Sequence, residues 1–163
     1  MDFEVRLATV EDADELGAVH VASWRETYFP HILSEASFAV ATPVARAERW
    51  REILESTGTA KTWVAIQDGR LIGFSGVGDP QDPDRPRPLH LYSLYVLAAA
   101  HGTGVGQALI DAALGGAPAS LWVAEDNPRA QAFYRRNGFV PDGTRKVDTF
   151  ILDEVAEIRM LRA

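Results

Sequence analysis

The fold is decided by the stretch LYSLYV at residues 91–96, which is followed by HGTGVG at residues 101–106 and QALI at residues 107–110. An apolar, aromatic strand therefore runs into a glycine-rich turn that opens a helix. In such a turn, backbone N–H groups converge on an anion, with the positive end of the helix dipole behind them. Glycine also allows backbone conformations and close approaches that a side chain would block. The stretch therefore predicts a site for a pyrophosphate-bearing cofactor.

Two familiar phosphate-binding motifs fit this turn badly. A P-loop needs Gly, four residues and then Gly-Lys-Ser/Thr, and no lysine stands between Leu91 and Ala130. A dinucleotide fingerprint needs Gly-x-Gly-x-x-Gly, whereas Gly102, Gly104 and Gly106 are evenly spaced. The spacing of the glycines therefore disfavours a nucleotide-dependent enzyme. If the protein bound CoA but neither ATP nor NAD, this alternative would be excluded.

A second informative segment lies downstream. The apolar run at residues 121–124 predicts a short buried strand, and Asn127 can cap a helix whose first residue is Pro128. Gly138 can end that helix in a left-handed conformation. One face of the predicted helix is shared by Ala130, Phe133, Tyr134 and Asn137.

Together the two segments resemble the GCN5-related N-acetyltransferase (GNAT) family. HGTGVG is similar to that family's acetyl-CoA signature, Gln/Arg-x-x-Gly-x-Gly/Ala, with His101 in place of the usual Gln or Arg. The run Asn-x-x-Ala-x-x-Phe-Tyr-x-x-x-Gly-Phe at residues 127–139 is similar to the second motif. The likeness is specific over about residues 89–140 and extends loosely to SWRETY at residues 23–28.

The resemblance implies an α/β (α+β layered) GNAT fold. In this fold a mixed, mostly antiparallel sheet of about six to seven strands is flanked by about four to five helices. The patterning of the chain agrees, because predicted strands and helices alternate without an internal repeat. The first predicted helix follows a capping box at Thr9 and Asp12 and runs to about residue 27, and a later one opens at the glycine turn and includes residues 107–110. The other predicted helices lie at about residues 34–40, 43–54 and 128–137, and the predicted strands at about residues 3–8, 62–67, 70–77, 91–96, 121–124, 144–147 and 157–162. Asp68-Gly69 suits a tight primed turn in a hairpin, and residues 80–88 predict a polar, proline-rich loop.

Length and composition agree with a single domain over residues 1–163. A chain of 163 residues can bury a sizeable core, and 47% hydrophobic and 24% charged residues are ordinary for a globular protein. No apolar run approaches the roughly 20 residues needed to cross a bilayer, and the first residues lack the features of a signal peptide. A formal charge of −7 argues against nucleic-acid and anionic-membrane partners. We expect a cytoplasmic protein, compatible with a monomer or a homodimer.

Cysteine and histidine usage restricts the chemistry. The sequence has no cysteine, which excludes a disulfide framework, a thiolate nucleophile and a Cys-based metal site. The four histidines, at positions 20, 31, 90 and 101, show no ligand spacing. We therefore expect neither a metal nor a covalent enzyme intermediate.

The resemblance implies cofactor-binding roles for particular residues. In the family, the strand before the glycine turn splays from its neighbour and pairs with the pantetheine arm of acetyl-CoA through backbone groups. The matching residues are Leu94, Tyr95 and Val96 for this arm, His101, Gly102, Thr103, Gly104, Val105 and Gly106 for the pyrophosphate, and Asn127 for a further contact. The alternatives are an ordinary core strand and, for Asn127, a plain helix cap.

The resemblance also implies a general acid. Tyr134 matches the tyrosine that commonly protonates the departing CoA thiolate. The alternative is a tyrosine that only packs beside Phe133. The backbone N–H of Val96 would polarise the thioester carbonyl.

The general base is less defined. His90 stands where many relatives carry a glutamate, and an unperturbed histidine, which titrates near pH 6.5, could take a proton directly or through water. Alternatives are an exposed strand-end histidine without a role, Glu26 or Asp79 as the base, or an acceptor that deprotonates with little help.

Trp24 and Tyr28 stand where relatives form part of the acceptor pocket. They could supply an apolar wall and cation–π attraction for an ammonium group, although aromatics at this spacing also serve as core residues. The predicted function is acetyl transfer from acetyl-CoA to a primary amine of a small molecule or peptide, and the acidic balance favours a cationic acceptor. The alternative is a non-catalytic acyl-CoA-binding sensor or structural module of the same fold.

Overall fold

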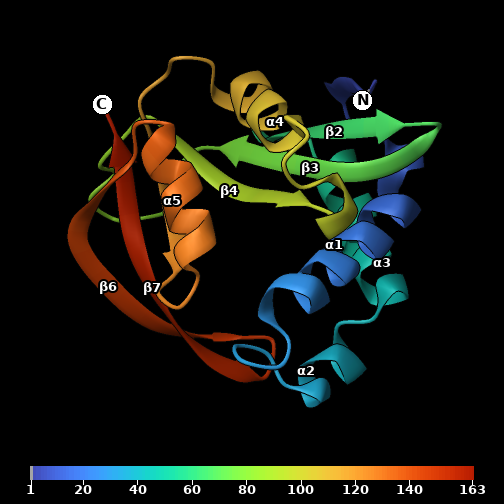
Figure 1. Ribbon diagram of the computed structural model, residues 1–163, viewed down its shortest axis with the longest axis horizontal. Helices are drawn as coiled ribbons and strands as arrows, with labels where there is room; N and C mark the ends of the chain where they lie inside the picture. The colour runs from blue at the N-terminus through green and yellow to red at the C-terminus, as the bar shows by residue number, and fades with distance from the viewer. Residues whose placement is uncertain (1) are drawn as a thin grey trace.

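The computed structural model describes residues 2–163, in which seven strands form one sheet with the order β1-β2-β3-β4-β5-β7-β6 (Figure 1). The strands are β1 (Glu4–Leu7), β2 (Lys61–Gln67), β3 (Arg70–Gly78), β4 (Leu89–Val96), β5 (Ala119–Ala124), β6 (Val140–Phe150) and β7 (Asp153–Arg162). The α-helices are α1 (Ala13–Tyr28), α2 (Glu35–Val40), α3 (Pro43–Glu55), α4 (Val105–Leu114) and α5 (Pro128–Arg136). The predicted layered α/β architecture is confirmed. The sheet is mixed and mostly antiparallel, because β4 and β5 are the one parallel pair among the described strands.

Local signals explain where several elements begin and end. The Asn127 side chain accepts a hydrogen bond of 3.2 Å from the Ala130 N–H, and Gly138 follows α5 with φ of +86°. In the β2–β3 hairpin, Asp68 and Gly69 have φ of +51° and +74°, as a primed turn requires.

The last two strands are longer than the sequence predicts. Val140 and Pro141 already pair with β7, but the register then shifts before Arg145. This bulge contains Gly143, whose φ of +88° breaks the alternation on which a sequence-based prediction depends. Cross-strand pairing therefore extends the hairpin through residues of low strand propensity.

Helices cover both faces of the sheet. On one face, α1 and α3 pack against β2 and β3 around Leu16, Trp50 and Phe74. On the other face, α4 and α5 enclose a second cluster that contains Ile110 and Tyr134. Within residues 2–163, no helix is both long and apolar enough to cross a bilayer.

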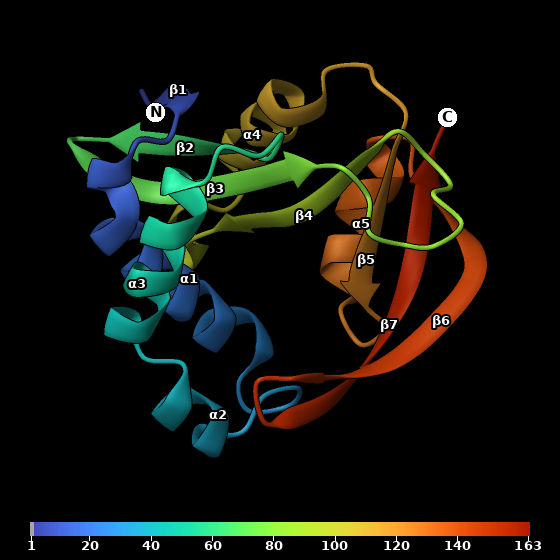
Figure 2. The ribbon, with the colours of Figure 1, turned by 180° about the vertical axis from the view of Figure 1, so that it is seen from behind.

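The sheet opens between β4 and β5. These strands pair only at Leu89↔Ala119, His90↔Ser120 and Leu91↔Leu121, and Figure 2 shows that they diverge beyond this point. Because Gly76 pairs with Ser93 and Val77 with Leu91, the intervening Tyr92 is an extra residue in β4. This bulge bends the strand where it leaves its neighbour.

An ion-pair network fixes the loop between β3 and β4, which lies beside β5 and β7 in Figure 2. The Arg159 side chain, 8% exposed, donates to Asp84 at 2.8 Å and to Asp142 at 2.7 Å, and it lies 3.4 Å from Asp82. Asp82 also accepts a hydrogen bond from the Trp122 indole at 3.1 Å. Ion pairs therefore fix the position of this loop, whose polar residues do not pack in the hydrophobic core.

We expect Arg159→Met to lower the free energy of unfolding by about 2–4 kcal/mol, because it leaves partly buried carboxylates without their cation. Urea unfolding would measure this loss. The control is Arg145→Met, which removes an exposed pair with Glu125 and should change the free energy of unfolding much less, because solvent screens that pair. Equal losses in the two variants would show that the network does not stabilise the fold.

Candidate active site

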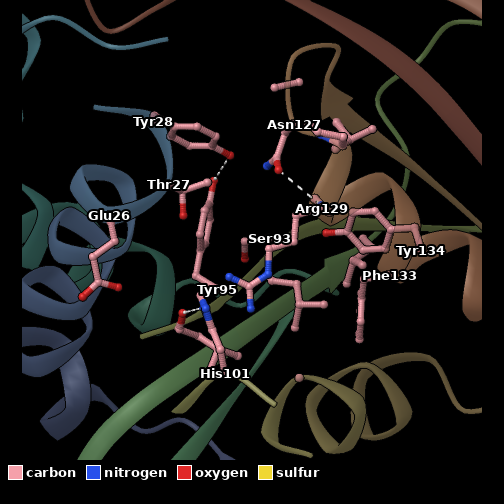
Figure 3. A pocket seen from close by; sticks show the side chains of 18 of the residues that line it. Glu26, Thr27, Tyr28, Ser93, Tyr95, His101, Asn127, Arg129, Phe133 and Tyr134 are labelled. Atoms are coloured by element: carbon pink, nitrogen blue, oxygen red, sulfur yellow. Dashed lines mark hydrogen bonds between the residues drawn. The ribbon is translucent and has the colours of Figure 1, made fainter. Parts of the chain in front are cut away.

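A cavity of about 890 Å³ opens where β4 and β5 diverge (Figure 3). Its walls come from the end of α1, the second half of β4, the glycine turn, the start of α5 and the cleft-facing side of β6 and β7. Segments that are far apart in the sequence therefore meet around one space, which includes both motifs that the sequence singles out.

The second half of β4 forms one wall of this cavity. Leu94, Tyr95 and Val96 all line it, beyond the last residue that pairs with β5. One edge of the strand is therefore turned toward the opening. His101 is tied to this strand, since its ring nitrogen Nε2 donates to the Val96 carbonyl at 2.8 Å.

The glycine turn forms the adjoining wall. Gly102 and Gly104 have φ of +75° and +92°, and a Cβ at either position would meet no protein atom within 4 Å. Gly104 is the N-cap of α4, so the first N–H groups of that helix, which lack intrahelical partners, lie next to the cavity. The turn thus combines left-handed backbone, open space and the positive end of a helix dipole.

Two residues of the turn do not contribute side chains to the cavity. Thr103 donates its hydroxyl to the Ala100 carbonyl at 2.5 Å, and Val105 is fully buried in the core. His101, Gly102, Gly104 and Gly106 do line the cavity.

Tyr134 projects from α5 into the cavity, and Figure 3 shows its hydroxyl pointing into the space. Burial raises the pKa of this phenol above its ordinary value of 10, so the hydroxyl stays protonated at neutral pH. Asn127 lines the same wall while its side-chain oxygen caps α5. Asn127 therefore both caps α5 and lines the cavity.

Tyr28 and Trp24 are separated by the structure. Tyr28 lines the cavity opposite Tyr134, and its hydroxyl lies 3.2 Å from that of Tyr95 (Figure 3). Trp24 is 3% exposed and packs behind this wall, with its ring centroid 5.1 Å from that of Phe150. The last turn of α1 thus reaches the cavity, whereas Trp24, one turn earlier, lies in the core.

The structure buries His90, so the alternative of an exposed strand-end histidine is wrong. His90 is 6% exposed and lies 2.8 Å from the Ser120 hydroxyl through Nδ1. Together with Asp82, Trp122 and Lys146 it lines a second hollow of about 230 Å³. Burial lowers the pKa of His90 to about 4, well below the ordinary histidine range that the sequence suggests.

The other two candidate bases have partners elsewhere. Glu26 lines the cavity, but its carboxylate accepts a hydrogen bond of 2.7 Å from the Ala98 N–H. Asp79 is exposed and accepts from the Thr59 hydroxyl at 3.1 Å. Neither carboxylate is positioned free inside the cavity.

Sequence reasoning missed Glu157, a half-buried carboxylate of β7 that lines both the cavity and the smaller hollow. Burial raises its pKa above the ordinary glutamate value. The signal that could have found it is the two-residue period of β7, because Val155, Glu157 and Arg159 share the cleft-facing side. No cluster of metal-ligating side chains is found in the described part of the chain.

The end of the cavity near Phe150 is held by contacts between α2 and the β6–β7 turn, which lie together in Figures 1 and 2. Asp153 accepts hydrogen bonds from the Ser34 N–H and hydroxyl, both at 2.9 Å, and from the Ser37 hydroxyl at 2.6 Å. These bonds fix the position of the two lining residues on either side of the turn, Phe150 and Val155.

Comparisons with known proteins agree with this geometry. The sequence model of the acetyltransferase (GNAT) family matches residues 19–139. The chain is 35% identical to an uncharacterised N-acetyltransferase from Mycobacterium tuberculosis, covering 82% of this chain and 86% of that protein. It is 26% identical to the peptidyl-lysine N-acetyltransferase YjaB from Salmonella typhimurium, covering 91% and 90% of the two chains.

The fold is likewise similar to solved structures. One is the PaiA N-acetyltransferase from Thermoplasma acidophilum in complex with coenzyme A, with a TM-score of 0.71 and 24% identity. The match covers 96% of this chain and 98% of that one, so the likeness extends over the whole sheet and its helices.

Proposed function

The chain belongs to the acetyltransferase (GNAT) family, and we propose that it moves the acetyl group of acetyl-CoA to a primary amine by direct attack in a ternary complex. The observation that carries this proposal is the convergence of three features on one cavity. These features are the open edge of β4, the left-handed glycine turn at the start of α4 and the buried phenol of Tyr134.

Each feature fits one part of the cosubstrate. The backbone of residues 94–96 would pair with the pantetheine arm, and the N–H groups of residues 101–106 would bind the pyrophosphate. Asn127 would add a contact from the start of α5. Acetyl-CoA supplies an activated thioester carbonyl, which the Val96 N–H would polarise.

Tyr134 would donate a proton to the sulfur that leaves. Its raised pKa keeps the hydroxyl protonated, and it lies across the cavity from the wall that contains Tyr28. Tyr28 would contact the acceptor, while Trp24 would support that wall from behind. The YjaB relative is named for peptidyl-lysine, and either a peptide or a small molecule would provide the amine.

We propose that His90 helps to move the amine's proton through water in the smaller hollow. With a pKa of about 4, the imidazole is already neutral at pH 7, so it can accept a proton only transiently. We expect His90→Ala to lower turnover measurably, by up to about tenfold near neutral pH, without moving the acid limb of the pH–rate profile. Turnover equal to wild type would leave His90 without this role.

Release of CoA thiol from acetyl-CoA in the presence of a panel of primary amines tests the proposed function. The proposal predicts amine-dependent release. The second candidate, a CoA-binding sensor, predicts binding of acetyl-CoA by calorimetry without thiol release from any amine. The buried, protonated phenol at the cavity favours the enzyme, since a sensor has no need of an acid there.

A further inference from the structure

Glu157 is unusual among the carboxylates of the cavity. Over residues 2–163 its side chain has no hydrogen-bond or ion-pair partner, although it is half-buried. The Glu26 carboxylate accepts a hydrogen bond from the Ala98 N–H, and Asp126 is exposed just before α5. The field of Lys146 lowers the pKa of Glu157 but does not outweigh burial, and Lys146 makes no bond to it. The carboxylate at this cavity wall is therefore open to a cationic ligand.

Charged and titratable groups around Glu157 come from four elements. On β6, the neighbouring strand, Lys146 lies directly opposite but pairs with Asp148 at 3.2 Å and stands 4.3 Å over the Trp122 ring. On its own strand, the Arg159 guanidinium is shared among three aspartates, one of them Asp82 of the β3–β4 loop. Neither cation is bonded to Glu157.

The third and fourth elements are β4 and α1. His90 of β4 shares the smaller hollow with Glu157 and is neutral at pH 7. Tyr95 of β4 and Tyr28 of α1 line the same cavity as Glu157, and its charge adds to the larger effect of burial in raising the pKa of both phenols. These groups line the same spaces as the carboxylate with hydroxyls and rings, and none of them supplies a cation.

The wall around Glu157 is aromatic and aliphatic. The cavity residues that provide it are Tyr28, Tyr95, Trp122, Phe150 and Val155. Aromatic faces attract an ammonium group and also pack against apolar carbons. The Lys146 ammonium already stands over one face of Trp122. The other rings of the wall, together with the Glu157 carboxylate, suit a second ammonium ion that is carried on an apolar skeleton.

We propose that Glu157 binds the acceptor as an alkylammonium ion and takes its proton, so that the acceptor is a cationic primary amine with apolar carbons next to the nitrogen. This inference rests on the proposed function. One ammonium proton passes to the Glu157 carboxylate, and the freed lone pair forms the C–N bond at the thioester carbonyl. The C–S bond breaks with its electrons on sulfur, which gains a proton from Tyr134. The nitrogen loses a second proton, which restores the phenol, and the proton on Glu157 leaves to solvent through the smaller hollow.

The test compares two probes with the same apolar skeleton, 2-phenylethylamine with a charged ammonium group and 2-phenylethanol with a neutral hydroxyl, by ligand-observed NMR on the full chain. At pH 7 wild type should bind the amine about tenfold tighter than the alcohol, a difference of about 1.4 kcal/mol. Glu157→Gln should weaken amine binding to the level of the alcohol. The matched control is Glu154→Gln, an exposed position on the same strand, which should behave as wild type.

The pH dependence of amine binding is a second readout, and a merely structural role of Glu157 would not produce it. Amine binding by wild type should fall as the pH drops through the pKa of Glu157, because the protonated carboxyl no longer attracts the ammonium. Since burial raises that pKa, the loss should begin at a higher pH than for an exposed glutamate. Glu157→Gln should show no such dependence, and its thiol release with 2-phenylethylamine should recover as the pH approaches the amine's pKa of about 10.

Three results would overturn the proposal: no amine binding at millimolar concentration, equal affinity of wild type for the two probes, or an unchanged amine affinity in Glu157→Gln. Calorimetry of acetyl-CoA binding by the same variants distinguishes a wrong role for Glu157 from a wrong proposed function. Unchanged acetyl-CoA binding with no charge preference contradicts the role of Glu157 alone. Loss of acetyl-CoA binding by wild type would instead contradict the proposed function.

Discussion

Replacing Tyr134 with phenylalanine is expected to lower turnover about tenfold to a thousandfold, the usual range for the loss of an acid catalyst. The affinity for acetyl-CoA should change little, because the ring remains and only the hydroxyl is removed. The structure supports this division: the ring packs against Phe133 and Phe139, while the hydroxyl points into the cavity (Figure 3).

Burial of Tyr134 sets the pH range in which its phenol can donate a proton. Because the pKa of the phenol is raised well above 10, the donor form is present throughout the neutral and mildly alkaline range. Deprotonation of Tyr134 should therefore cause no loss of turnover in that range.

The control for this prediction is Tyr92→Phe. The Tyr92 ring also lines the cavity, but its hydroxyl is already engaged with the Asp79 carbonyl. This change should leave turnover close to wild type. Single-turnover thiol release from acetyl-CoA would measure the chemical step directly in both variants. A normal rate in Tyr134→Phe would remove this residue from the mechanism.

The second large effect is expected at Gly104, where valine should weaken acetyl-CoA binding about tenfold to a hundredfold. Valine tolerates φ of +92° poorly, and holding it there costs about 1–3 kcal/mol. No protein atom lies within 4 Å of the added Cβ, so the loss does not come from a clash within the chain. It comes from a turn that can no longer direct its N–H groups at the pyrophosphate, and from a side chain in the space that the cosubstrate needs.

Gly69→Val is the matched control for this prediction. Gly69 also has a positive φ, of +74°, with nothing within 4 Å of an added Cβ, but it lies in the β2–β3 turn and does not line the cavity. Both variants should lose stability, whereas only Gly104→Val should lose affinity in calorimetry. Equal affinity of the two variants for acetyl-CoA would refute the role of the glycine turn.

The strongest sequence signals lay in local motifs, and the structure agrees with them. Capping at Asn127 and the primed turn at Asp68-Gly69 each depend on contacts within a few residues, so their geometry could be predicted. The resemblance to the family likewise predicted the sheet and the opening beside β4, because both motifs occupy fixed places in the fold of that family.

Features that depend on tertiary contacts could not be predicted. Burial of His90 comes from strand pairing and the anchored β3–β4 loop, and this burial is what lowers its pKa. Glu157 was missed because its strand was predicted without an assignment of faces. Trp24 and Tyr28 share a helix face in the sequence pattern, but only the end of α1 reaches the cavity.

The central claim is that backbone N–H groups of the β4 edge and the glycine turn bind the two ends of one acyl carrier. Backbone amide NMR during titration with acetyl-CoA tests it most directly. We predict that the largest chemical-shift changes fall on residues 94–96 and 101–106, and that they saturate together. Shifts centred on another surface, or no saturable shifts at all, would contradict the account.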